Sequence, residues 1–172
     1  MSLLAVTVIG VDRPGIIAAV TGALAQVGGN LEDSSMTILG GHFAMSLIVS
    51  VDAGEDAVRR ALEPATGALG LAAFVGEVTV APGHTVTGAP YVVSVHGADR
   101  PGIVSRVMGV IASYGGNVTD LTTRLSGDLY VVVADVDVPL QVDLEALRAS
   151  LDAAAEELGV DVTVRAADPD LL

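Results

Sequence analysis

Apolar and polar positions along the first half of the chain alternate between two periods. Short apolar runs predict strands, and apolar positions spaced three or four residues apart predict helices. The predicted strands span residues 4–9, 31–39, 43–51 and 72–80. The predicted helices span residues 16–27 and 58–69, and the second contains Pro64 and Gly67, which weaken its pattern. Glycine pairs follow the first helix and join the two middle strands. The order is βαββαβ.

The second half repeats this order. Its predicted strands span residues 91–96, 118–125, 129–136 and 160–164. Its predicted helices span residues 103–114 and 144–158, and the second is strongly amphipathic. Asp143 is a suitable N-cap for that helix and Gly159 a suitable end. The pattern therefore predicts two units of the same kind.

A βαββαβ order with right-handed crossovers predicts an α+β, ferredoxin-like unit, in which both helices cover one face of an antiparallel four-stranded sheet. The expected domains are residues 1–80 and 91–167, with a linker rich in Pro, Gly and Thr over 81–90 and an acidic tail over 168–172. Several strands are apolar on both sides, so the uncovered faces or edges are expected to meet another sheet, either that of the sister domain or that of another chain. We therefore expect self-association, in the form of a homodimer.

The two halves resemble each other most closely around one turn. Residues 6–34 align without a gap on residues 93–121, and about half of these aligned positions are identical. The following segments, residues 35–51 and 122–138, share very few. The retained part includes the turn between the first strand and the first helix of each half, and the Gly-Gly-Asn that starts the next strand.

The retained residues could bind an α-amino acid. The exposed N–H groups at the start of a helix favour a carboxylate, and a glycine allows close approach of the ligand. An aspartate beside them can accept an ammonium group, and the asparagine that starts the next strand can both donate and accept. The first set is Asp12, Gly15, Ile16 and Asn30, and the second is Asp99, Gly102, Ile103 and Asn117.

The same residues also have a purely structural interpretation. Asp-x-Pro-Gly is a good helix start, with the aspartate as cap and the proline in the first helical turn, and Gly-Gly-Asn is a good helix end. From chemistry alone the two interpretations stand about equal. The retained aspartate favours binding, because Ser, Thr or Asn would cap a helix equally well.

Composition excludes several other functions. The net charge is −13 and all eight basic residues are scattered arginines, so direct binding of nucleic acid or of an anionic membrane is not expected. There are no cysteines, the three histidines are far apart, and no nucleophile motif or phosphate loop is present. We expect no catalytic residues, metal or cofactor. No signal peptide or membrane segment is recognised, so a cytoplasmic protein is expected.

With these motifs identified, both halves resemble ACT domains, regulatory modules that bind amino acids. Residues 29–34 and 41–45 are also similar to the glycine cleavage system transcriptional repressor family, whose members are tandem ACT pairs. The resemblance implies a ligand held between the turn of one domain and the strand start of a neighbour. The implied ligand-binding residues are Asp12, Arg13, Gly15, Ile16, Asn30, Asp99, Arg100, Gly102, Ile103 and Asn117.

That family implies regulation through a protein partner, such as a transcription factor, in the control of glycine metabolism. Some family members carry Asn where this chain has Asp12 and Asp99, and aspartate suits an ammonium group but repels a carboxylate. Two alternatives remain open. One is a ligand-free adaptor that only dimerises, and the other is the regulatory subunit of a separate enzyme.

Overall fold

A computed structural model describes residues 2–79 and 88–167 of the chain. The chain divides into two compact units, Met1–Gly83 and His84–Leu172. Residues 81–87 of the predicted linker and the predicted tail 168–172 lie outside the described residues.

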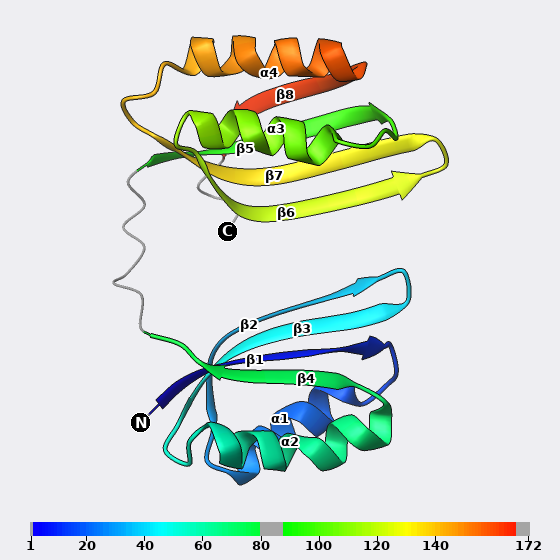
Figure 1. The fold of residues 1–172 in the computed structure, drawn as a ribbon, viewed down its shortest axis with the longest axis vertical. Coiled ribbons are helices and arrows are strands. Elements are labelled where there is room, and N and C mark those ends of the chain that lie inside the picture. Colours follow the sequence, from blue (N-terminus) through cyan, green and yellow to red (C-terminus); the bar gives the residue numbers. More distant parts are fainter. Residues whose placement is uncertain (1, 80–87, 168–172) are drawn as a thin grey trace. The chain divides into compact units, whose positions relative to one another are not determined.

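Each unit has the predicted βαββαβ order (Figure 1). The elements of unit 1 are β1 (Ser2–Val11), α1 (Ile16–Gln26), β2 (Asn30–Leu39), β3 (His42–Val51), α2 (Glu55–Leu69) and β4 (Ala72–Glu77). The elements of unit 2 are β5 (Gly88–Ala98), α3 (Ile103–Ser113), β6 (Asn117–Ser126), β7 (Leu129–Pro139), α4 (Leu144–Leu158) and β8 (Val160–Ala166).

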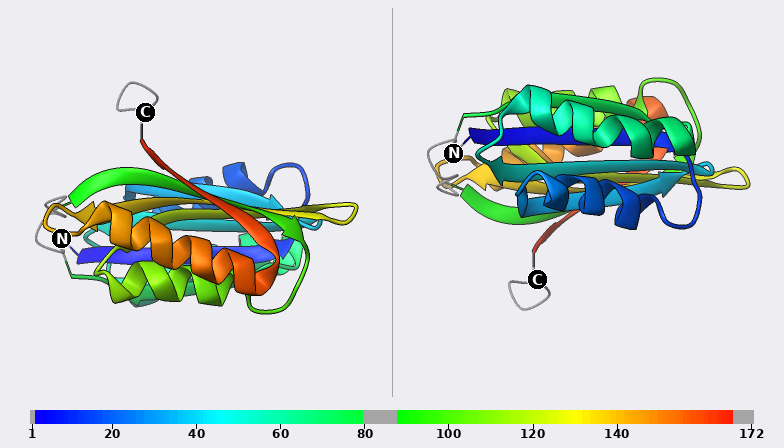
Figure 2. Two further views of the ribbon diagram at one scale, coloured as in Figure 1. Left: turned by 90° about the horizontal axis from the view of Figure 1, so that it is seen from above. Right: turned by 90° about the horizontal axis from the view of Figure 1, so that it is seen from below.

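Each sheet has four antiparallel strands, in the orders β2-β3-β1-β4 and β6-β7-β5-β8. The two helices of a unit lie side by side on one face of its sheet (Figure 2). Alternate strand residues, mostly valines and leucines, are buried against these helices, and Phe43 is the largest fully buried side chain. The predicted α+β, ferredoxin-like fold is confirmed.

Some predicted ends were wrong by a few residues. Helix α2 runs through Pro64 and Gly67, so the proline weakens the pattern without ending the helix. Strand β4 ends at Glu77 and not at residue 80. Strand β5 begins at Gly88, so residues 88–90, assigned to the linker, belong to the second sheet. Pro90 is tolerated there because it lies just outside the β5–β8 pairing, which begins at Tyr91, and its carbonyl oxygen accepts from the Ala167 N–H at 3.0 Å.

A bulge interrupts the pairing of β2 with β3, between Leu31 and Asp33. The equivalent strand β6 has a register shift between Val118 and Asp120. One extra residue in a strand reverses which side chains face each side of the sheet beyond it. As a result Met36 and the other even-numbered residues of β2 that follow the bulge lie on the face of the sheet that the helices cover.

The glycines that end α1 and α3 have two structural roles. Gly28 and Gly115 have a φ of 74°, a left-handed conformation that ends a helix. A Cβ on Gly29 would lie 3.0 Å from both the Leu24 carbonyl oxygen and a Val49 methyl. The structure therefore accounts for the Gly-Gly pair without a ligand, as the structural interpretation predicts.

Gly15 and Gly102 allow a test of backbone strain alone. Their φ values are 92° and 97°, and an added Cβ at Gly15 would meet nothing within 4 Å. We expect Gly15→Ala to destabilise unit 1 by about 1–2 kcal/mol, the cost of a left-handed conformation. Gly22→Ala, at an exposed position inside α1 with equally open space, is the matched control and should stabilise by about 0.5–1 kcal/mol. Urea unfolding monitored by circular dichroism measures the free energy of unfolding of both variants. Equal effects of the two changes would contradict the left-handed conformation assigned to Gly15.

Candidate functional site

The turn between β1 and α1 lies beside an open pocket of about 510 Å³. The main-chain N–H of Asp12 donates to the Gly41 carbonyl oxygen at 3.0 Å, which ties this turn to the β2–β3 hairpin. The pocket is lined by Asp12, Arg13, Pro14, Gly15, Ile16, Ile17, Ala18, Met36, Ile38 and Phe43. The first four predicted turn residues of unit 1 therefore lie around one cavity.

The start of α1 lines this cavity and has main-chain donors that no side-chain cap satisfies. The cap is Gly15, which supplies no side-chain acceptor, and the N–H groups of the first turn have no partner within the helix. The Ile16 side chain is buried in the core and fixes the position of the helix start. Partial positive charge at these donors favours an anionic group.

Two details of the structural interpretation were wrong. Asp12 is not the helix cap, because the cap is Gly15, three residues later. Pro14 precedes the cap and so lies in the turn, outside the first helical turn. The carboxylate of Asp12 therefore satisfies no N–H group of the helix as a cap would, and the structural interpretation does not explain it.

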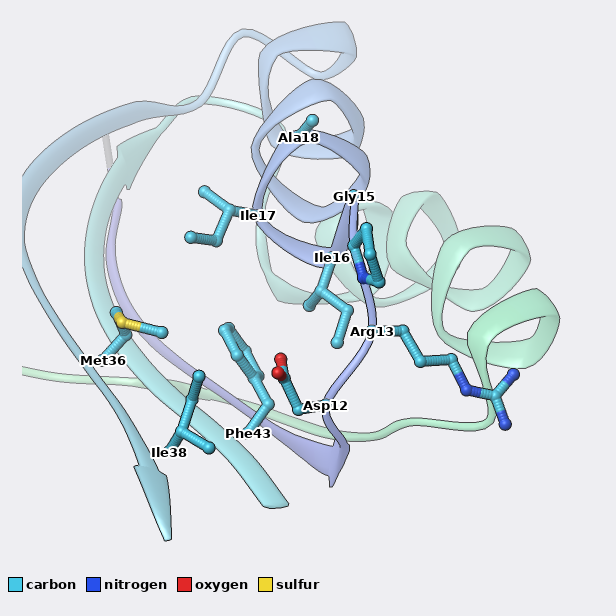
Figure 3. Close-up of a pocket in the computed structure, with 10 residues that line it drawn as sticks. Asp12, Arg13, Gly15, Ile16, Ile17, Ala18, Met36, Ile38 and Phe43 are labelled. Atoms are coloured by element: carbon cyan, nitrogen blue, oxygen red, sulfur yellow. The ribbon is translucent and has the colours of Figure 1, made fainter. Parts of the chain in front are cut away.

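Figure 3 shows how the side chains are arranged around the pocket. Met36, Ile38 and Phe43 lie along one side, and the carboxylate of Asp12 lies between them and the start of α1. The side chain of Arg13 points away from them. The side chains that face the cavity are therefore one carboxylate and a mostly apolar wall.

Asn30 is not part of this pocket. Strand β3 lies between β1 and β2, and the two predicted site residues lie at opposite ends of the sheet. Val11, next to Asp12, pairs with His42, whereas Asn30 pairs with Ser50, eight residues further along β3. At about 3.3 Å per residue this is a separation of roughly 26 Å. Within one unit Asp12 and Asn30 cannot contact the same amino acid, so a joint site requires a neighbouring unit.

The side chain of Asn30 has local partners. Its amide donates to Glu32 Oε1 at 3.4 Å, and the hydroxyl of buried Ser50 donates to the same oxygen at 2.6 Å. In unit 2 Asn117 pairs in register with Asp137 on β7. Each strand start thus combines an asparagine with a nearby carboxylate.

The turn of unit 2 has the same backbone but different surroundings. Helix α3 begins after Gly102 without a side-chain cap, and a smaller pocket of about 310 Å³ lies beside it. That pocket is lined by Asp99, Arg100, Pro101, Gly102, Ile103, Val104, Ser105 and Tyr130. The hydroxyl of Ser105 donates to the Gly102 carbonyl oxygen at 3.0 Å.

Two arginines, Arg100 in the turn and Arg106 in α3, connect this region to the end of α4. Arg100 donates to the Leu158 carbonyl oxygen at 3.2 Å, and its guanidinium lies against Gly159, the C-cap of α4. Arg106 donates from Nε and Nη2 to one oxygen of Glu157, at 3.1 and 2.8 Å. Arg100 therefore has a structural contact that accounts for its position without a ligand.

Sequence reasoning missed the pocket wall formed by Met36, Ile38 and Phe43, and Tyr130 in unit 2. Met36 and Ile38 are apolar residues at alternate positions of an otherwise polar segment, which is a usable signal. Recognising that they face the turn also requires knowing the strand order and the bulge.

One histidine of the unit 2 sheet lies close to a carboxylate. His96 lies 3.5 Å from Asp161 across β5 and β8, and no group of three or more His, Asp or Glu side chains in residues 2–79 and 88–167 could hold a metal ion. None of the described helices combines the length and the apolar character needed to cross a membrane.

Comparison with known proteins identifies the two units. The ACT domain family matches residues 2–76 and again residues 90–165. A UPF0237 protein of Methanopyrus kandleri is 44% identical over 78 residues, which are 45% of this chain and 87% of that protein. The glycine cleavage system transcriptional repressor of Escherichia coli is 28% identical over 122 residues, which are 70% of this chain and 64% of the repressor.

A solved structure also matches both units. The crystal structure of an unknown protein from Galdieria sulphuraria has a TM-score of 0.78 and 30% identity, and covers 97% of this chain and 99% of that one. Because the family model matches both units and together most of the sequence, this chain belongs to the ACT domain family and consists of two ACT domains in tandem.

Proposed function

We propose that this chain is a regulatory protein that binds an amino acid at its turn pockets and signals occupancy to a protein partner. One observation carries the proposal. In unit 1 an uncapped helix start and an aspartate carboxylate, which does not cap the helix, line the same open pocket. An α-amino acid carries the two complementary charges on neighbouring atoms, the carboxylate for the N–H groups and the ammonium for Asp12.

The residues proposed to bind are those at the turns and strand starts. Asp12 and Asp99 hold the ammonium, the main chain at Gly15, Ile16, Gly102 and Ile103 holds the carboxylate, and Asn30 and Asn117 complete the sites of neighbouring units. The side chain of Arg13 points away from Met36, Ile38 and Phe43, and Arg100 is engaged by α4, so neither needs to contact the ligand. Their charge makes the turn less repulsive to a carboxylate.

The response to binding is proposed to pass through a change in how units associate. A ligand that contacts a turn on one unit and a strand start on another stabilises only the arrangement in which both are adjacent. The relative from Escherichia coli is named as a transcriptional repressor. With a net charge of −13, control of transcription by this chain would act through a DNA-binding partner, not through direct contact with DNA.

An adaptor that associates without ligand is the second candidate. Ile9 and Phe74 lie on the face of the unit 1 sheet that has no helices, with 50% and 62% of their surface exposed. Exposed apolar side chains on a sheet favour association with another surface. The adaptor function requires self-association that is independent of amino acids.

Thermal unfolding in the presence of each common amino acid separates these two functions. An amino acid at one hundred times its Kd should stabilise the native protein by about 2.7 kcal/mol, because it binds the folded state only. We expect one or a few amino acids to raise the melting temperature by several degrees. If none does, while the protein still self-associates, the adaptor is favoured.

Removing the carboxylate of the first turn should weaken binding. We expect Asp12→Ala to raise the Kd by about ten- to a hundredfold, the loss of one hydrogen bond to a charged group. Asp12→Asn, which keeps the shape but not the charge, should lie between. Asp152→Ala removes an exposed carboxylate from α4 and is the control for net charge. Calorimetric titration measures all four proteins, and equal affinity of the wild type and Asp12→Ala would exclude this site.

The separation of Asp12 and Asn30 within one unit leads to a test of the shared site. We expect the effect of Asp12→Ala on the Kd to be non-additive with that of Asn30→Ala or with that of Asn117→Ala, because residues that contact one ligand are coupled. Coupling to Asn30 would indicate association of like units, and coupling to Asn117 association of unlike units. Additivity with both asparagines would contradict a site shared between units.

A further inference from the structure

The pocket of unit 1 has an apolar wall that the fold itself does not require. Ile17, Met36 and Ile38 line it with 46%, 43% and 52% of their surface exposed, and the buried ring of Phe43 lies beside them. Met36 and Ile38 stand opposite Met45 and Phe43 in the β2–β3 pairing, on the side of the sheet that carries the helices. Helix α1 leaves both side chains half uncovered at the edge of the core.

Unit 2 keeps only part of this wall, because Val104 and Leu125 are apolar where unit 1 has Ile17 and Ile38, but other positions have become polar. In the alignment of the two halves, Ala18, Met36 and Phe43 correspond to Ser105, Thr123 and Tyr130. Each change adds a hydroxyl, and neither Thr123 nor Leu125, the counterpart of Ile38, lines the smaller second pocket. The backbone of the turn is retained while the character of the pocket beside it changes.

Charge limits what the wall can hold. Asp12 is the acid that lines the unit 1 pocket, and the guanidinium of Arg13 points away from the apolar side chains. A molecule that fills the cavity would place a positive group at the turn and an uncharged, apolar group against Met36 and Ile38. Burial of these exposed side chains would favour such a molecule over one without an apolar part.

We propose that the unit 1 pocket selects an amino acid with an extended apolar side chain, such as leucine or methionine, and that Met36 and Ile38 determine this specificity. The inference rests on the proposed function, since the main-chain groups and Asp12 hold the common part of the amino acid. Glycine would leave the wall uncovered and bind more weakly. The second pocket, with Ser105 and Tyr130, does not share the preference.

Calorimetric titration of the full chain with leucine, methionine and glycine tests the proposal. The wild type should bind leucine and methionine at least tenfold more tightly than glycine. The double variant Met36→Thr, Ile38→Thr should weaken the binding of leucine at least tenfold and change the affinity for glycine less than twofold. Both replaced side chains are exposed and threonine suits a strand, so the fold should persist.

Leu125→Thr is the matched control. It removes an equally exposed apolar side chain, 58% accessible, from the aligned position of unit 2, and should leave leucine binding within twofold. Melting temperatures of all variants check the fold. If the double variant has a lowered melting temperature, the single variant Met36→Thr replaces it. That variant should still weaken the binding of leucine more than the binding of glycine.

The outcomes separate this inference from the function on which it rests. Equal affinity for leucine and glycine, lost in both cases with Asp12→Ala, would overturn the selectivity and keep the amino-acid site. Absence of binding by any amino acid would overturn both. Light scattering adds a further readout: if the double variant changes the oligomeric state and not the leucine affinity, a second copy covers the wall and the proposal is wrong.

Discussion

Antiparallel pairing of the first strand with the third determines where every functional group of a unit can lie. Because β1 and β3 run in opposite directions, the end of β1 meets the β2–β3 hairpin, and the turn that follows is hydrogen-bonded to it through Asp12 and Gly41. The same pairing sends the start of β2 to the far end of the sheet. The turn and the asparagine, retained together in both halves, are therefore kept apart within each unit.

The two units have diverged around a common backbone. Helices α1 and α3 each start after a glycine in the left-handed conformation, which supplies no side-chain cap. Main-chain donors are therefore available at the start of each. In unit 1 the turn is hydrogen-bonded to the β2–β3 hairpin through Asp12 and Gly41. In unit 2 Arg100 and Arg106 connect the turn to the end of α4. A movement of the second turn would therefore act on the end of α4, whereas a movement of the first turn would act on the β2–β3 hairpin.

Much of this arrangement could be predicted from the sequence. The two periods of hydrophobicity and the repeat were sufficient to predict the element order, the fold and the position of the turn, because these depend on local spacing. Strand ends were less accurate, as at Gly88, because pairing partners and not local preference extend a strand. The prediction that Asn30 could bind the ligand of its own turn failed, because strand order is a property of the whole sheet. The apolar wall was missed for the same reason.

The bulge near the start of β2 has a consequence for how the pocket could arise or disappear. Beyond it, Met36 faces Met45 and the helices; if the register of the pairs Asn30–Ser50 and Leu31–Val49 continued along the strand, Met36 would lie opposite Ala44, on the other side of the sheet. Deleting the one extra residue near Glu32 would join the pair Leu31–Val49 directly to the pair Asp33–Ile48 and leave Met36 opposite Met45. The wall would therefore survive loss of the bulge, because the β2–β3 hairpin sets the register of this part of the strand. Variation among relatives in pocket character is to be sought in the length of that hairpin and in substitutions along the wall.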